Sequence, residues 1–110
     1  MTTEQQRKMM ECAAKACGLI VIGYQGDGLL IASDGCRSGY LWNPLSNPAD
    51  TAEMCAELGI GTRWYLFDDF VVCGPSYNNV TAYFKDHDNS RLKAWMYAAT
   101  MVATKIGDLK

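Results

Sequence analysis

The sequence predicts an α+β fold, a three-layer α/β/α sandwich around a mainly antiparallel sheet, with the element order αβββαβββα. Two observations predict this class. Both ends of the chain place apolar residues at helical spacing, whereas the middle holds short apolar runs separated by Gly, Pro, Asn and Asp. Because successive strands joined by tight turns pair antiparallel, we expect a mainly antiparallel sheet. The 110 residues fit a single domain, 1–110.

The first helix is predicted over residues 3–17, where Met9, Ala13 and Ala16 recur at helical spacing. A β-branched apolar run follows at 19–24. We expect this run to form a strand buried on both faces, and therefore expect helices on both sides of the sheet. The next elements are a glycine-containing turn, a strand, a polar loop and a short strand, at residues 25–28, 29–32, 33–39 and 40–42.

A central helix has well-marked boundaries in the sequence. Asn47 is a typical N-cap, and Pro48 occupies the first helical position, where a missing N–H has no consequence. We expect the helix to run through Leu58 and to end at Gly59, a residue type common just past a helix C-terminus.

A short motif precedes this central helix. We expect Trp42 to pin the sheet to the helix, and Asn43 to hydrogen-bond backbone groups in the turn that follows. Pro44 prevents an earlier helix start, because proline lacks the N–H that a helix interior needs. We therefore interpret these three residues as structural.

The second half of the chain predicts three further strands and a last helix. Strands at 64–67 and 70–73 flank the turn Asp68-Asp69, and a half-exposed strand alternates apolar and polar residues over 80–85. A polar loop at 86–89 leads to a helix capped by Asn89 or Ser90. The apolar face of that helix consists of Leu92, Trp95, Met96, Ala99, Val102, Ala103 and Ile106.

Composition argues against several classes of function. A net charge of −2 gives no electrostatic reason for strong binding to nucleic acid or to an anionic membrane. We expect no signal peptide and no membrane span, since the first residues are polar and no apolar run approaches ~20 residues. The five cysteines are scattered without a CxxC pair, which favours a reducing cytosol and buried thiols. We expect no metal and no cofactor.

Two short motifs are better explained as turns than as binding or catalytic sites. Gly23, Gly26 and Gly28 precede a strand rather than a helix, so they indicate a hairpin turn and not a phosphate-binding loop. Asp68-Asp69 is interpreted as a hairpin turn, because neighbours in a tight turn point apart whereas an acid–base pair must converge.

The motif Asp86-His87-Asp88 has the most chemical character. A histidine between carboxylates suits a general base or a weak metal ligand. It stands where a strand passes to a helix, and Asp88 is a candidate helix cap, so we favour a structural loop. A nucleophilic pair of His87 with Cys73 or Cys36 is a less favoured alternative, because an apolar strand disfavours the thiolate of Cys73.

Aromatic residues are abundant in the second half. Arg63 lies beside Trp64 and Tyr65, a combination typical of surfaces that stack on a base or bind a protein. We expect about half of the aromatic side chains in the core and the rest on strand faces, where some, among them Tyr65, Tyr83 and Tyr97, remain at the surface. The predicted binding surface consists of Arg63, Tyr65, Tyr77 and Tyr83.

The chain resembles the phage α/β/α-sandwich domain family, small proteins encoded by bacteriophages and prophages. The resemblance covers residues 40–105. It implies a three-layer sandwich, a phage origin and a location in the cytoplasm of the bacterial host, and it implies no established activity or catalytic residue. The residues that carry it are Leu41-Trp42-Asn43-Pro44-Leu45, Asn47-Pro48-Ala49-Asp50, Met54 and Leu58-Gly59-Ile60.

Three functions follow as hypotheses. The favoured one is a non-enzymatic protein that binds a host or defence-system protein through a sheet edge or the predicted surface. The second is a sponge for a signalling nucleotide or another small molecule, acting as a homo-oligomer, with Arg37, Arg63 and Lys85 on phosphates and an aromatic ring on a base. The third is an enzyme that uses His87 with a carboxylate or a cysteine.

Overall fold

The computed structural model of the chain describes residues 2–32 and 39–109. Its elements follow the predicted order with one added 3-10 helix, and the α+β class and the antiparallel pairing are confirmed. The elements are α1 (Thr3–Ala16), β1 (Val21–Gln25), β2 (Gly28–Ile31), β3 (Tyr40–Trp42), α2 (Pro48–Leu58), β4 (Thr62–Tyr65), β5 (Phe70–Cys73), β6 (Val80–Tyr83), η1 (Phe84–His87) and α3 (Arg91–Asp108).

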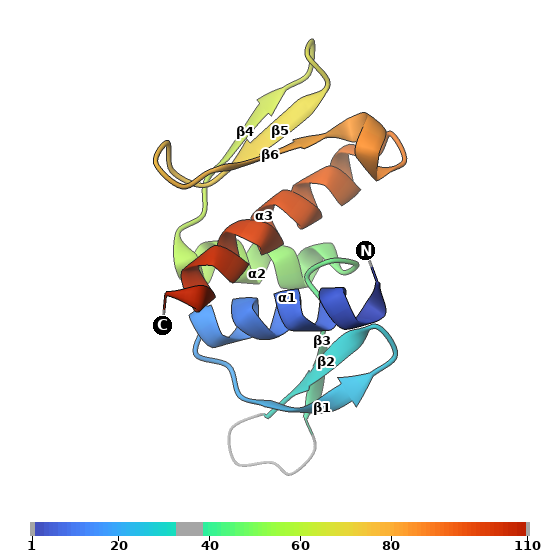
Figure 1. Cartoon of the computed structure of the whole chain (residues 1–110), viewed down its shortest axis with the longest axis vertical. Coiled ribbons are helices and arrows are strands. Elements are labelled where there is room, and N and C mark those ends of the chain that lie inside the picture. The colour runs from blue at the N-terminus through green and yellow to red at the C-terminus, as the bar shows by residue number, and fades with distance from the viewer. Residues whose placement is uncertain (1, 33–38, 110) are drawn as a thin grey trace.

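The six strands in the described part of the chain form two separate sheets. The first sheet contains β1, β2 and β3, the second contains β4, β5 and β6, and every pair is antiparallel. Figure 1 shows the two sheets at opposite ends of the molecule, with the helices between them. The expectation of one continuous sheet is therefore corrected to two, because α2 follows β3 and carries the chain away before β4 begins.

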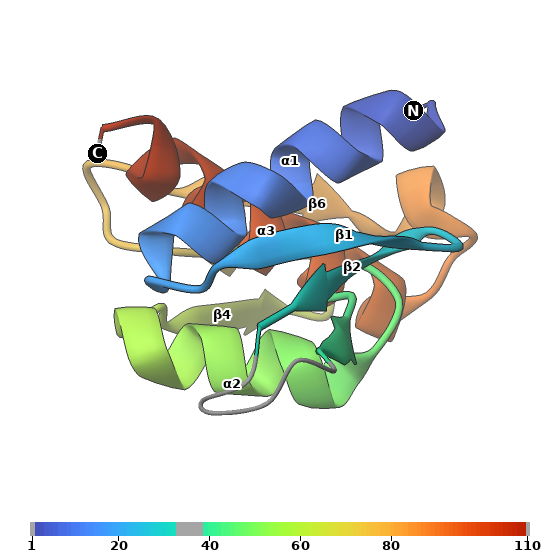
Figure 2. The same cartoon turned by 90° about the horizontal axis from the view of Figure 1, so that it is seen from below.

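The first sheet buries one face and leaves the other open. Leu29, Ile31 and Trp42 are buried in the core, whereas Ile20 and Ile22 are 67% and 50% exposed. The prediction that this apolar run is buried on both faces was wrong. Figure 2, viewed from this end of the molecule, shows β1 and β2 in front of the helices, so the described helices cover only the inner side.

The motif before α2 is structural, as predicted. Trp42 is buried in the core that the first sheet shares with the helices. The side-chain oxygen of Asn43 accepts a hydrogen bond from the Leu45 N–H at 3.2 Å. The carbonyl of Pro44 accepts a hydrogen bond from the buried Thr51 hydroxyl at 2.7 Å, which ties the turn to α2.

Helix α2 begins and ends where the sequence predicts. Asn47 accepts a hydrogen bond from the Ala49 N–H at 3.0 Å, and Pro48 takes the first helical position. Gly59 follows the helix with φ of +67°, a conformation that glycine adopts without the steric cost of a side chain.

Helix α3 joins the two ends of the molecule. It packs against α1, α2, β5, β6 and η1 (Figure 1). Ser90, one of the two predicted caps, accepts a hydrogen bond from the Lys93 N–H at 3.1 Å. Ala99 and Val102 are buried as predicted, whereas Leu92 is 47% exposed, because it lies in the first turn of α3 beside the edge strand β4.

The β4–β5 hairpin differs from its prediction. β4 ends at Tyr65, so Leu66 and Phe67 belong to a four-residue turn instead of a strand. The Asp68 N–H donates to the Tyr65 carbonyl at 3.2 Å, and Asp69 has φ of +58°. Aspartate tolerates this left-handed conformation better than most residues, so the pair closes a longer turn than we expected.

Strand β6 alternates as predicted but is shorter. Ala82 and Phe84 are buried, whereas Thr81, Tyr83 and Lys85 are exposed. The strand ends at Tyr83, and η1 occupies part of the segment predicted as a polar loop. The exposed residues of β6 therefore face outward at the end of the molecule that carries the second sheet.

Candidate functional site

The outer face of the second sheet carries a row of aromatic rings. Tyr65 on β4, Phe70 on β5 and Tyr83 on β6 are direct cross-strand neighbours, so their side chains share one face. The rings of Tyr65 and Phe70 stack at 4.7 Å between centroids, and those of Phe70 and Tyr83 lie 5.4 Å apart. Arg63 and Thr81 lie two residues further along β4 and β6 and therefore belong to the same face. We call these five residues the aromatic face.

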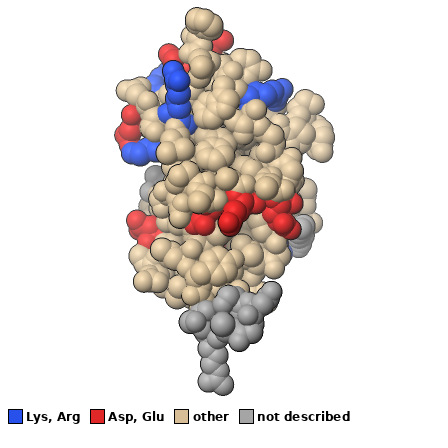
Figure 3. All heavy atoms as spheres, turned by 180° about the vertical axis from the view of Figure 1, so that it is seen from behind, with Lys and Arg blue, Asp and Glu red and all other residues tan. Residues whose placement is uncertain are grey.

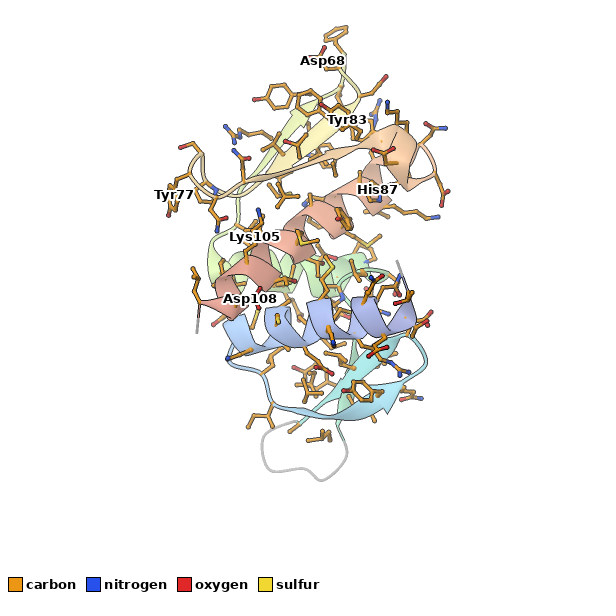
Figure 4. All side chains as sticks on the ribbon, in the orientation of Figure 1. Asp68, Tyr77, Tyr83, His87, Lys105 and Asp108 are labelled. Atoms are coloured by element: carbon orange, nitrogen blue, oxygen red, sulfur yellow. The ribbon has the colours of Figure 1, made fainter. Side chains whose placement is uncertain are left out.

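An apolar hairpin tip adjoins the aromatic face. Phe67 is fully exposed and Leu66 is 47% exposed, although both are large apolar residues. Figure 4 shows Asp68 at the tip of the hairpin, where it projects from the end of the molecule. We call Leu66 and Phe67 the hairpin tip. Together the tip and the aromatic face form an outward surface of the kind that marks interaction sites.

The structure brings together three of the predicted surface residues. Arg63, Tyr65 and Tyr83 lie on the aromatic face. Tyr77 is 89% exposed but belongs to the loop before β6, and Figure 4 shows it at the far end of that strand from Tyr83. Arg37, the remaining predicted binding residue, lies outside the described residues. Tyr77 is therefore removed from the predicted surface.

A cleft of about 660 Å³ lies beside β6. One wall is the strand itself, from Thr81 to Tyr83, and α3 contributes Met96 and Tyr97. The opposite wall holds Gln6 of α1 together with Leu45 and Ser46 of the turn before α2, and η1 adds Asp86 and His87. Its volume lies within the range of small-molecule pockets.

His87 occupies one end of this cleft and packs against a ring. Its imidazole lies 4.7 Å from the Tyr97 ring, measured between centroids. Burial lowers the pKa of His87, while the neighbouring carboxylates of Asp86 and Asp88 oppose that shift. Asp88 forms an ion pair with Lys93 at 2.8 Å, which lowers the pKa of its carboxyl group.

The proposed His87–cysteine pair finds no support among the described contacts. Cys73 is buried in β5, and its sulfur lies 3.7 Å from the Thr62 hydroxyl. Burial raises the pKa of Cys73, and it raises that of Cys55 to about 11. A thiol with a raised pKa is a poor nucleophile at neutral pH. Cys36 lies outside the described residues.

The described residues contain no cluster of three or more His, Cys, Asp or Glu side chains arranged to hold a metal ion. None of the helices in residues 2–32 and 39–109 has the length and apolar character needed to cross a membrane. Figure 3 shows Lys and Arg mixed with Asp and Glu at the end that carries the second sheet, and an acidic band across the middle. This face therefore presents no continuous basic stripe for nucleic acid.

Sequence reasoning missed several residues of this surface. Phe70 was assigned to a strand without a role, yet its ring joins Tyr65 to Tyr83. Successive side chains of a strand point to opposite faces of the sheet, and the length of the turn fixes which residues of the two strands pair. The sequence therefore predicts this face once the length of the β4–β5 turn is known. The cleft wall of Gln6 and Ser46 has no local signal, because it depends on how α1 and the turn before α2 approach β6.

Comparison with known proteins yields no relative for this chain. No protein-family model matches it, and neither a curated protein nor a solved structure does so. The features that bear on function are therefore the aromatic face, the hairpin tip and the cleft.

Proposed function

We propose that this chain is a non-enzymatic protein-binding module, phage-encoded and related to the phage α/β/α-sandwich family, that acts on a host or defence-system protein in the bacterial cytoplasm. The observation that carries the proposal is the aromatic face with its adjoining hairpin tip. Phe67 is fully exposed there, and Tyr65 and Tyr83 are 39% and 46% exposed.

Physical reasoning favours a protein as the partner of this surface. Exposing large apolar side chains side by side is unfavourable unless a partner covers them. Aromatic residues and arginine are enriched at the centres of protein interfaces, where they contribute much of the binding free energy. Arg63 and the three adjacent rings supply that composition on one three-stranded sheet, where paired strands leave little ordering to be done on binding.

The nucleotide sponge is the second candidate. Lys85 places its amino group 5.9 Å from the Tyr83 ring centroid. Both residues line a pocket of about 470 Å³, to which Arg91 also contributes. Asp68 and Asp69 line it too, and their carboxylates oppose a phosphate. A thermal-shift screen with nucleotides and cyclic nucleotides, combined with light scattering, tests this candidate and its homo-oligomer. Stabilisation by one nucleotide would favour it over protein binding.

Affinity capture with matched variants tests the proposed function. The tagged chain is used to capture proteins from bacterial lysate, and recovery is quantified for the wild type and for Phe67→Ser. We expect recovery of the partner to fall by at least about tenfold in Phe67→Ser, because a hot-spot aromatic side chain is lost. The thermal midpoint should stay unchanged, since Phe67 is fully exposed and contributes nothing to the core.

Tyr77→Ser is the matched control for this experiment. It removes another exposed aromatic side chain, at a loop apart from the aromatic face (Figure 4). We expect Tyr77→Ser to retain the partner. Equal recovery with the wild type and Phe67→Ser, or loss only with Tyr77→Ser, would contradict the proposed surface.

A further inference from the structure

We propose that β6 binds an extended peptide segment of a partner protein as an added strand, with a basic side chain of that segment placed against Asp86. This inference rests on the proposed protein-binding function and names the form in which the partner is recognised. It concerns the cleft beside β6, whereas the proposed function rests on the aromatic face and the hairpin tip.

Along the side that faces the cleft, the backbone of β6 forms no hydrogen bond to another described residue. β6 is an edge strand of the second sheet. The Phe84 N–H donates to the Asp69 carbonyl at 2.9 Å, so the pair Phe84–Asp69 is a hydrogen-bonded pair of the β5–β6 ladder. Hydrogen-bonded pairs alternate with non-hydrogen-bonded pairs along an antiparallel ladder. The backbone N–H and C=O groups of Ala82 therefore also point toward β5, where Ala82 pairs with Val71. Thr81 and Tyr83 therefore direct their N–H and C=O groups away from β5.

These outward backbone groups lie where the cleft is. Thr81 and Tyr83 both line it, so their free donors and acceptors border a space of about 660 Å³. An unpaired strand edge is a template for a further strand, and β-strand addition is a recurring mode of peptide recognition. A peptide in this position would extend the second sheet from three strands to four.

The far wall of the cleft offers further hydrogen-bonding groups. The side chains of Gln6 and Ser46 line that wall and form no hydrogen bond to any other described residue. An amide and a hydroxyl suit the second edge of an added strand, whose backbone groups would otherwise face the protein unpaired. Met96 of α3 and Leu45 of the far wall provide apolar surface in the cleft.

The side chains of an added strand would meet two different surfaces. Successive residues of a strand point to opposite faces, so alternate peptide side chains would lie next to Tyr83 on the aromatic face. The intervening side chains would point toward Met96 and Tyr97 of α3. The added strand would thus continue the surface already proposed for the partner.

Charge favours a basic segment. Asp86 lines the cleft, and its carboxylate forms no ion pair with the described residues. Lys93 also lines the cleft, but its positive charge is matched by Asp88 at 2.8 Å. The uncompensated charge beside the cleft is therefore negative, and a lysine or arginine of the peptide complements it.

Peptide selection on the full chain tests the inference. A random library of linear decapeptides is selected on the immobilised protein, and the affinity of the most enriched peptide is measured in solution. Single backbone N-methyl groups are then introduced along that peptide. We expect losses of about tenfold at alternate positions and clearly smaller losses at the intervening ones, since only alternate N–H groups of an added strand face the backbone of β6.

Protein variants provide the second arm. Thr81→Pro removes the outward N–H while leaving the hydrogen bonds to β5 in place, so it should weaken the peptide, whereas Thr81→Val should not. Asp86→Asn should weaken a basic peptide and flatten its salt dependence. The matched control Asp27→Asn, in the turn between β1 and β2, should leave affinity unchanged.

Three results would overturn the inference: no peptide enriched by the wild-type chain, N-methyl effects without alternation, or a bound peptide that protects amides elsewhere than in β6 from hydrogen exchange. Peptide affinity should also be unchanged in Phe67→Ser. If peptide selection fails while partner capture still depends on Phe67, then strand addition is wrong and the proposed function stands.

Discussion

At Gly107 the backbones of α1 and α3 pass so close that no side chain fits between them. A Cβ atom at this position would clash with the backbone carbonyl oxygen of Cys12. The atom in the way belongs to the backbone of a helix, so relief requires the helices to separate. The glycine is therefore needed for the α1–α3 contact, despite its low helix propensity.

Gly107→Ala should destabilise the fold by about 3 kcal/mol, because it overpacks the helix crossing. The thermal midpoint would fall by at least roughly 10 °C. Thermal denaturation followed by circular dichroism measures this. Gly61→Ala is the control, since a Cβ there meets no atom within 4 Å. Equal midpoints for the two variants would show that α1 and α3 do not cross as described.

His87 should make stability depend on pH in a narrow range. Because burial lowers its pKa in the folded state, the unfolded chain binds a proton more readily. The contribution of neutral His87 to the free energy of unfolding should therefore be fully present above the unfolded pKa of about 6.5. It should be lost as the pH falls from there through the lower pKa of the folded state. Denaturant unfolding between pH 5 and 8, compared with His87→Gln, measures the effect. An equal decrease in both proteins would assign it to other groups.

At the scale of elements, both ends of α2 are set by residues within or next to the helix itself. Asn47 caps its first turn and Gly59 ends it. We expect Asn47→Ala to destabilise the protein by about 1 kcal/mol, because the Ala49 N–H loses its acceptor. Asn47→Ser should retain most of the stability, since serine is also a good N-cap. Urea unfolding of both variants separates this capping effect from a packing effect, which would affect both alike.

The elements also show what sequence reasoning reaches. Helix boundaries followed from caps, from Pro48 and from helical spacing, all of which act within a few residues. The end of β4 did not, because the choice between a two-residue and a four-residue turn depends on the positive φ of Asp69. With a four-residue turn, Leu66 and Phe67 belong to the hairpin tip and not to the predicted strand. The candidate site was therefore only partly predictable.

At the scale of the whole molecule, α3 is the structural centre. The arrangement of two sheets was not predictable from the sequence, since apolar runs such as the one at 19–24 do not reveal which face a helix will cover. The sequence pattern of the strands likewise does not indicate that Tyr77 lies apart from Tyr83. Such facts depend on contacts between residues far apart in the chain.

Hydrogen exchange should reflect this central role of α3. We expect the amides of Ala98, Ala99 and Val102 to be among the slowest to exchange, because their side chains are fully buried between the other elements. Amides of the hairpin tip should exchange fastest among the second-sheet residues. Native-state exchange followed by NMR measures both, and rapid exchange in the middle of α3 would contradict this description of the core.

Site-specific photo-crosslinking tests the central claim most directly. A benzophenone amino acid replaces Phe67 in one chain and Tyr77 in another, and both chains are irradiated inside bacteria. If the hairpin tip contacts a partner protein, a discrete crosslinked band should appear with the probe at position 67 and be absent with the probe at position 77. A band at position 77 alone, or no band at position 67 in cells that contain the partner, would contradict the proposed binding surface.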